Sequence, residues 1–226
     1  MNNVGLIAKK VGMSRMVDDQ GQLTPVTLLQ ATDQTITKKL TTERDGYQAI
    51  QIGFYEKSEK NLTKSDIARL RKNNVTKNFS KFKEVRVEDS SAEGLEFGAE
   101  RTIDIFNEVK SIDVTGFVKG RGFQGTVKRY NTKTGRRTHG SHFHRRPGSL
   151  GNCTTPGRVM KNKKQPGQMG ANKVTVLNLK VLDVDTETNT IAIKGSVPGT
   201  RNGYLYLRPS IKAPAPVVDK KKGGKK

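Results

Sequence analysis

One long segment of this chain carries positive charge and no negative charge. Residues 114–182 contain no Asp or Glu, yet they hold fifteen Lys and Arg residues, eleven Gly and all three His residues of the protein. If acidic residues were spread at random, a window of this length would lack them only about once in a thousand times. A one-signed segment repels itself unless a polyanion neutralises it. We therefore expect this segment to lie outside any compact core and to bind nucleic acid.

The rest of the chain has an ordinary charge balance. Of the net charge of +21, the acid-free window supplies +15, and the other 157 residues combine 27 basic with 21 acidic residues. A membrane partner is not expected, because the window is too rich in Gly for an amphipathic helix. The single Cys153 excludes an internal disulfide, and no apolar run resembles a signal peptide or a membrane span. These features predict a cytoplasmic protein.

Short β-rich runs separated by turn signals occupy both ends of the chain. The patterns predict one helix over 62–71 and strands over 5–17, 25–29, 47–55, 82–87, 103–106, 112–118, 174–177, 181–182, 190–194 and 204–207. Many short strands with little helix favour a small antiparallel β-barrel. We predict a mainly β protein whose body, a closed β-barrel with a minor α/β part, comprises residues 1–113 and 174–213.

Between these two parts of the body the chain loses its periodicity. Apolar residues are sparse over 120–173, while Gly, Pro, Asn, Thr, Arg and Lys dominate. Loops of this length in compact domains are functional projections or disordered segments. We predict a long irregular basic loop extension over 114–173, mobile over 122–172 when RNA is absent. The Lys-rich tail over 214–226 cannot bury apolar surface, so we expect it to be disordered.

Several patterns in the basic segment resemble catalytic or cofactor motifs without their context. Residues 120–125 match G-x-G-x-x-G, but the stretch 126–135 is a poor helix and the acid that holds a ribose is missing. Residues 121–123 match only the start of an RNA-recognition-motif strand. A zinc site is disfavoured because four Arg residues surround its candidate ligands His139, His142, His144 and Cys153. We expect no metal, no cofactor, no small-molecule substrate and no enzyme activity.

The basic segment instead combines cations with flat rings and with sharp Gly and Pro turns. Lys and Arg can bind phosphates, while imidazole and phenyl rings can stack on bases or riboses. The expected RNA-binding residues are Arg121, Lys128, Arg129, Arg136, Arg137, His139, His142, Phe143, His144, Arg145, Arg146, Arg158, Lys161, Lys163 and Lys164. Tyr130 could add a further ring.

Three motifs in the segment resemble a known family. They are GSHFHRRPGSLG at 140–151, TPGR at 155–158 and GQMG at 167–170. They closely resemble the bacterial large-subunit ribosomal protein L-three family, and residues 5–13, 26–27 and 116–125 fit the same family. The similarity covers most of residues 1–213.

The resemblance implies a translation-protein-like barrel on the outer side of the large ribosomal subunit. It also implies an extension through large-subunit rRNA towards the peptidyl-transferase region, with its tip at Ser149, Leu150, Gly151, Asn152, Cys153, Thr154 and Thr155. The implied partners are large-subunit rRNA and neighbouring large-subunit ribosomal proteins, and the implied role is structural and in early subunit assembly. A glutamine that can be methylated in the family is replaced here by Asn152.

Two other functions remain as alternatives. A nucleic-acid-modifying enzyme could use the basic segment to deliver its substrate, and an acid–base cluster in a pocket of the body would favour it. A DNA-compacting protein is disfavoured, because the sequence shows neither a helix-turn-helix nor a dimerisation pattern.

Overall fold

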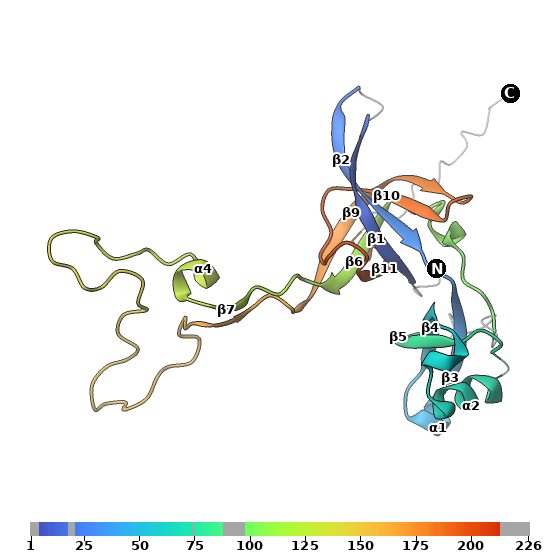
Figure 1. Ribbon diagram of the computed structural model, residues 1–226, viewed down its shortest axis with the longest axis horizontal. Coiled ribbons are helices and arrows are strands. Elements are labelled where there is room, and N and C mark those ends of the chain that lie inside the picture. Colours follow the sequence, from blue (N-terminus) through green and yellow to red (C-terminus); the bar gives the residue numbers. More distant parts are fainter. Residues whose placement is uncertain (1–4, 18–20, 74, 88–97, 213–226) are drawn as a thin grey trace, which may run out of the picture. The chain divides into compact units, whose positions relative to one another are not determined.

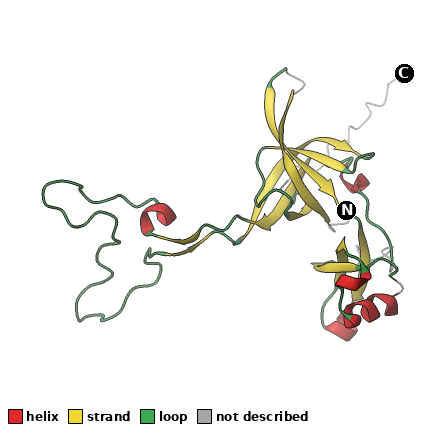
Figure 2. Ribbon diagram, in the orientation of Figure 1, coloured by secondary structure: helices red, strands yellow, loops and turns green. Residues whose placement is uncertain are grey.

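The computed structural model describes residues 5–17, 21–73, 75–87 and 98–212 of the chain. The chain divides into two compact units, which we call the body (residues 1–116 and 174–226) and the extension (residues 117–173). Strands form most of the body, and loops form most of the extension (Figures 1 and 2). The prediction of a mainly β protein is confirmed. The predicted tail over 214–226 lies outside the described residues.

Six antiparallel strands form the main sheet of the body. They are β1 (Leu6–Val17), β2 (Leu23–Ala31), β6 (Ser111–Phe117), β9 (Lys173–Asp185), β10 (Thr190–Lys194) and β11 (Tyr204–Pro209). Their order is β1-β11-β6-β9-β10-β2, and β2 also pairs with β1, so every strand has two neighbours. Residues two apart in β1 and β10, Leu6 with Ala8 and Ile191 with Ile193, are fully buried in one core cluster. A strand places residues two apart on the same face, which favours strands in these segments.

A smaller antiparallel sheet contains β3 (Gln34–Leu40), β4 (Ala49–Glu56) and β5 (Phe79–Arg86) in that order. The helix α1 (Thr42–Asp45) connects β3 to β4 and ends at Gly46, whose φ of 79° suits glycine. The 3-10 turn η1 (Glu59–Asn61) and the helix α2 (Lys64–Lys72) connect β4 to β5. The Thr63 hydroxyl accepts a hydrogen bond from the Asp66 amide, which starts α2. Leu70 anchors α2 by packing against Val75 and Phe79.

The structure corrects one predicted strand. Residues 103–106 form the 3-10 helix η2 (Ile103–Phe106) and not a strand. In a 3-10 helix, residues three apart lie on one face. Ile103 and Phe106 both enter the main core, while Asp104 between them stays exposed. In addition, the two predicted runs at 174–177 and 181–182 belong to one strand, β9.

No helix among the described residues is long and apolar enough to span a bilayer.

Gln34 joins the two sheets of the body. Its side chain is 2% exposed. Its Oε1 accepts a hydrogen bond from the Ile7 amide at 3.0 Å, and its Nε2 donates to the carbonyl oxygens of Ile7 at 3.2 Å and of Thr32 at 3.1 Å. One side chain therefore satisfies backbone groups of β1 and of the link before β3.

Replacing Gln34 with Leu should lower the free energy of unfolding by about 2–3 kcal/mol, because it leaves the buried Ile7 amide without its acceptor. Urea denaturation followed by circular dichroism measures this loss. The exposed Gln30 on β2 offers a matched control, and Gln30→Leu should change the stability by less than about 0.5 kcal/mol. Equal stability of the two variants would contradict the proposed role of Gln34.

Candidate nucleic-acid interface

The two ends of the extension are held together by a short two-stranded ribbon. β7 (Gly122–Gln124) pairs with β8 (Gly167–Met169) in antiparallel register. Next to it, the Arg121 amide donates to the Met169 carbonyl at 2.9 Å, and the Val118 amide donates to the Asn172 carbonyl at 3.0 Å. Gly170 has a φ of 76°, and a Cβ there would overlap the Lys119 carbonyl. The prediction of an irregular chain throughout 120–173 is therefore wrong at this base.

One helical turn follows the ribbon. The helix α4 (Thr126–Tyr130) begins after Gly125 and ends at Asn131, whose φ is 54°. The expectation of a poor helix over 126–135 missed this turn, because a buried Thr126 and tertiary contacts of Arg129 support it.

Arg129 fastens α4 to the returning strand. Its Nη1 donates to the Gln165 carbonyl at 2.9 Å, and its guanidinium lies 5.1 Å from the centre of the Tyr130 ring. A Cβ at Gly167 would lie 2.6 Å from Nη1, so glycine makes room for the guanidinium. Arg129 is half-buried, unlike the other predicted RNA-binding residues. We conclude that Arg129 stabilises the base of the extension.

Hydrogen exchange on the RNA-free protein should reveal this base. We expect slow exchange at the amides of Val118, Arg121 and Ala171, which bond across the ribbon, and fast exchange over 145–162. Arg129→Ala should accelerate exchange at Arg121, whereas Arg137→Ala, at an exposed site, should not. Strong protection over 145–162 in the free protein would contradict the expected mobility of the distal part.

Beyond α4, a hydrogen-bonded loop lies between Gly135 and His144. The Gly135 amide donates to the His144 carbonyl at 2.9 Å, and His144 Nδ1 lies 3.0 Å from the Arg136 carbonyl oxygen. Gly135 has no space for a Cβ, because the Phe143 carbonyl lies against it. These contacts present the exposed side chains of Arg136 and Arg137 on a loop whose ends are joined.

The predicted RNA-binding residues are otherwise at the surface. All except Arg129 are exposed: Arg121, Lys128, Arg136, Arg137, His139, His142, Phe143, His144, Arg145, Arg146, Arg158, Lys161, Lys163 and Lys164. Lys164 Nζ also lies 6.0 Å from the centre of the Tyr130 ring. Within the described residues, every ion pair lies in the body. The extension thus presents cations that no carboxylate of its own neutralises.

The tip residues Ser149, Leu150, Gly151, Asn152, Cys153, Thr154 and Thr155 are all exposed. The Ser149 hydroxyl donates to the Gly151 carbonyl at 2.8 Å. Cys153 Sγ lies 3.5 Å from the Thr154 hydroxyl, and this hydrogen bond lowers the pKa of the Cys153 thiol. The tip itself carries no charge, although cations flank it on both sides.

Reasoning from the sequence missed two kinds of residue in the extension. Lys119, Lys133 and Lys173 are exposed and belong to the same acid-free window, so charge alone would have included them. Gln165, which accepts a hydrogen bond from Arg129, gave no signal because it lies 36 positions away along the chain, and the GQMG motif marked Gly167 without indicating that it makes room for Arg129.

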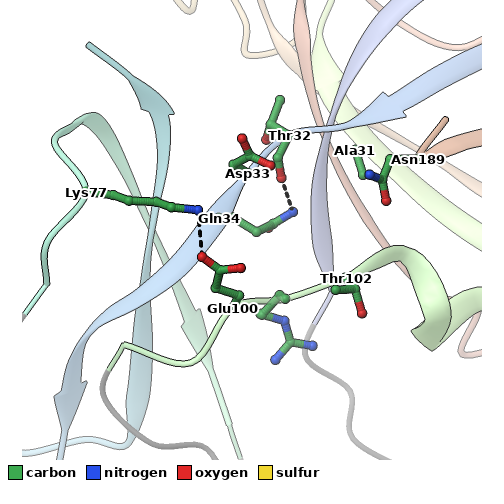
Figure 3. A pocket seen from close by; sticks show the side chains of 9 residues that line it. Ala31, Thr32, Asp33, Gln34, Lys77, Glu100, Thr102 and Asn189 are labelled. Atoms are coloured by element: carbon green, nitrogen blue, oxygen red, sulfur yellow. Dashed lines mark hydrogen bonds and ion pairs between the residues drawn. The ribbon is translucent and has the colours of Figure 1, made fainter. Parts of the chain in front are cut away.

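The body contains a polar pocket of about 180 Å³, drawn in Figure 3. It is lined by Ala31, Thr32, Asp33, Gln34, Lys77, Glu100, Arg101, Thr102 and Asn189. Lys77 Nζ lies 2.6 Å from a Glu100 carboxylate oxygen, and this hydrogen bond raises the pKa of Lys77. A lysine acting as a general base needs a lowered pKa. No group of three or more potential metal ligands occurs in the described parts of the chain. The pocket does bring an acid and a base together, as the enzyme alternative requires, but Glu100 and Lys77 are paired with each other, and the raised pKa of Lys77 argues against its acting as a general base.

The fold and the interface together define a class of protein in which a folded β body carries a basic extension that can bind a polyanion. A family model described as Ribosomal protein L3 matches residues 29–191. A relative named large ribosomal subunit protein uL3 from Shewanella sp. (strain W3-18-1) is 44% identical over 211 residues, which cover 93% of this chain and 99% of the relative. The protein of the same name from Geobacillus sp. (strain WCH70) is 43% identical over 212 residues, covering 93% and 98%. This chain belongs to the ribosomal protein L3 family, which confirms the resemblance found in the sequence.

Proposed function

We propose that this protein is a structural constituent of the large ribosomal subunit in the bacterial cytoplasm. It binds large-subunit rRNA and supports early assembly of the subunit. The observation that carries this proposal is the row of exposed extension cations without carboxylate partners. The relatives are named as proteins of the large ribosomal subunit, which supports large-subunit rRNA as the polyanion.

The proposed mechanism is charge neutralisation. The exposed Lys and Arg residues of the extension contact phosphates, so that rRNA helices pack more closely than their mutual repulsion would allow. Arg side chains such as Arg145 and Arg146 can also form bidentate contacts and stack on bases. The imidazoles and Phe143 supply flat faces among these cations.

The functional parts follow the predicted domains. The predicted segment 114–173 contains the RNA-threading extension, whose tip over 149–155 approaches the peptidyl-transferase region. The predicted segments 1–113 and 174–213 contain most of the body, and its six-stranded sheet is a closed, translation-protein-like barrel that contacts neighbouring large-subunit proteins. The support for closure is that β2 pairs with both β10 and β1. We propose no catalytic role and no cofactor.

Fractionation of ribosomes tests the proposed function. A tagged copy of the protein, expressed as the sole copy in cells, should sediment with large subunits and whole ribosomes and should be absent from small subunits. Purified protein should retain large-subunit rRNA in preference to small-subunit rRNA. Sedimentation with small subunits, or only as free protein, would contradict the proposal.

A further inference from the structure

Tyr55 stands out in the body because a bulky, exposed side chain occupies a left-handed backbone conformation. Its φ is 65° and it is 38% exposed at the end of β4. Bulky residues rarely adopt this conformation, and they persist in it where the surrounding structure enforces it, commonly at binding sites. β5 enforces it here: the Ser80 hydroxyl donates to the Tyr55 carbonyl at 3.4 Å, and the Lys57 amide donates to the Asn78 carbonyl at 2.9 Å.

The Tyr55 ring lies in an aromatic cluster. The ring forms a T-shaped contact with the ring of Tyr204 of β11, with centroids 5.5 Å apart and planes at 74°. Tyr204 in turn packs against Phe54 in the same manner at 5.5 Å. The ring of Tyr55 is therefore positioned by its neighbours and still partly open to solvent.

The ammonium groups of two lysines lie near the Tyr55 ring. Lys57 Nζ lies 5.7 Å and Lys81 Nζ lies 5.4 Å from its centre, and Lys81 Nζ is also 4.9 Å from the centre of the Tyr204 ring. The distances to Tyr55 are close to the outer limit of cation–π attraction, about 6 Å, so each ammonium can turn to a phosphate at little cost. Within the described part of the chain, neither Lys57 nor Lys81 forms an ion pair with a carboxylate.

We propose that Tyr55, Lys57 and Lys81 bind one unstacked nucleotide of large-subunit rRNA, a second contact that is independent of the extension. The base stacks on the open part of the Tyr55 ring, and the two ammonium groups bind the flanking phosphates. An acidic protein segment would match the lysines but would leave the strained, exposed ring without a role. This inference rests on the proposed function, because the RNA is the one that the whole protein binds.

The substitution Tyr55→Asn separates binding from folding. Asn tolerates the left-handed conformation, and this relief of backbone strain offsets the lost contact with Tyr204, so the melting temperature of the full-length protein should change little. The affinity for purified large-subunit rRNA should fall by about tenfold, since the stacking of one base is lost. Tyr55→Phe keeps the ring and should retain the affinity.

Tyr47→Asn is the matched control. Tyr47 is 36% exposed in the bend before β4, and Arg86 lies 5.5 Å from the centre of its ring. Its hydroxyl, however, donates to Glu84 at 3.1 Å, and this carboxylate would repel a phosphate. Tyr47→Asn should therefore leave the affinity unchanged.

The outcomes are distinct. If the wild-type protein does not bind large-subunit rRNA, the proposed function fails. If the wild type binds and Tyr55→Asn binds equally well, the inference about Tyr55 fails alone. A lower melting temperature with unchanged affinity assigns Tyr55 a structural role only. Unchanged affinity for naked rRNA with reduced retention in assembled subunits assigns the surface to a protein partner. Each of the last two results also overturns the inference about Tyr55.

Discussion

Replacing both Arg145 and Arg146 with Glu should sharply reduce the amount of mature large subunits in cells that depend on the variant. Both side chains are exposed in the extension, and no acid within 114–182 neutralises them. Each reversal removes a phosphate contact and places an anion against the rRNA backbone, so we expect rRNA affinity to fall roughly a hundredfold. Sucrose-gradient profiles measure the loss as a smaller large-subunit peak and an accumulation of precursors.

A substitution at the tip provides the control. Residues 149–155 carry no charge and lie between Arg146 and Arg158. Asn152→Ala should therefore leave the large-subunit peak nearly intact while it alters translation or susceptibility to drugs that act at the peptidyl-transferase region. In this account Arg145 and Arg146 anchor the extension to rRNA, whereas the tip acts through its position. This account is wrong if Asn152→Ala loses subunits as severely as the charge reversals do, or if the charge reversals assemble normally.

The second large effect is the dependence of rRNA affinity on salt concentration. If six or more phosphates are neutralised, the slope of log affinity against log salt concentration should be about −4 to −5 or steeper. Affinity for large-subunit rRNA should then fall by about 10²–10³ between 50 and 200 mM salt. Filter binding over a salt series measures the slope for the full-length protein.

The structure indicates where to shorten the extension for comparison. Replacing residues 126–165 with a short Gly-Ser link removes most exposed cations of the extension, together with Arg129 and Gln165, and leaves the sequences of β7 and β8 intact. This variant should keep the circular dichroism spectrum and melting transition of the body, because the core cluster of the body draws no residue from 126–165. It should lose most of the salt dependence. An unchanged slope would place the principal RNA surface on the body.

The regular parts of the fold could be predicted because local pattern and tertiary burial agree. β10 matches the predicted range 190–194, and its apolar residues Ile191 and Ile193 are fully buried with Ala192 between them. α2 begins within two residues of its predicted start, at a position set by the Thr63 cap. In these elements local signals support the periodicity, because β-branched residues favour a strand in β10 and a capping residue favours a helix start in α2.

Other elements depend on contacts that are distant in sequence. β3 was not predicted, because the polar residues Gln34, Thr35 and Thr37 are buried there and no apolar alternation marks the strand. η2 was predicted as a strand, because a short apolar run fits a strand or a helix. Its packing in the core determines which of the two forms. The charge of the extension was evident from composition, but the half-buried Arg129 was indistinguishable from its exposed neighbours until its partner Gln165 was located.

We propose that the extension is the principal rRNA-binding surface of this protein. Ultraviolet crosslinking in living cells, followed by sequencing of the bound RNA and mass spectrometry of the crosslinked peptides, tests it most directly. The expected result is large-subunit rRNA joined mainly to peptides from 121–164, with a smaller number of crosslinks at Tyr55. Crosslinks to another class of RNA, or large-subunit rRNA joined only to peptides of the body, would contradict it.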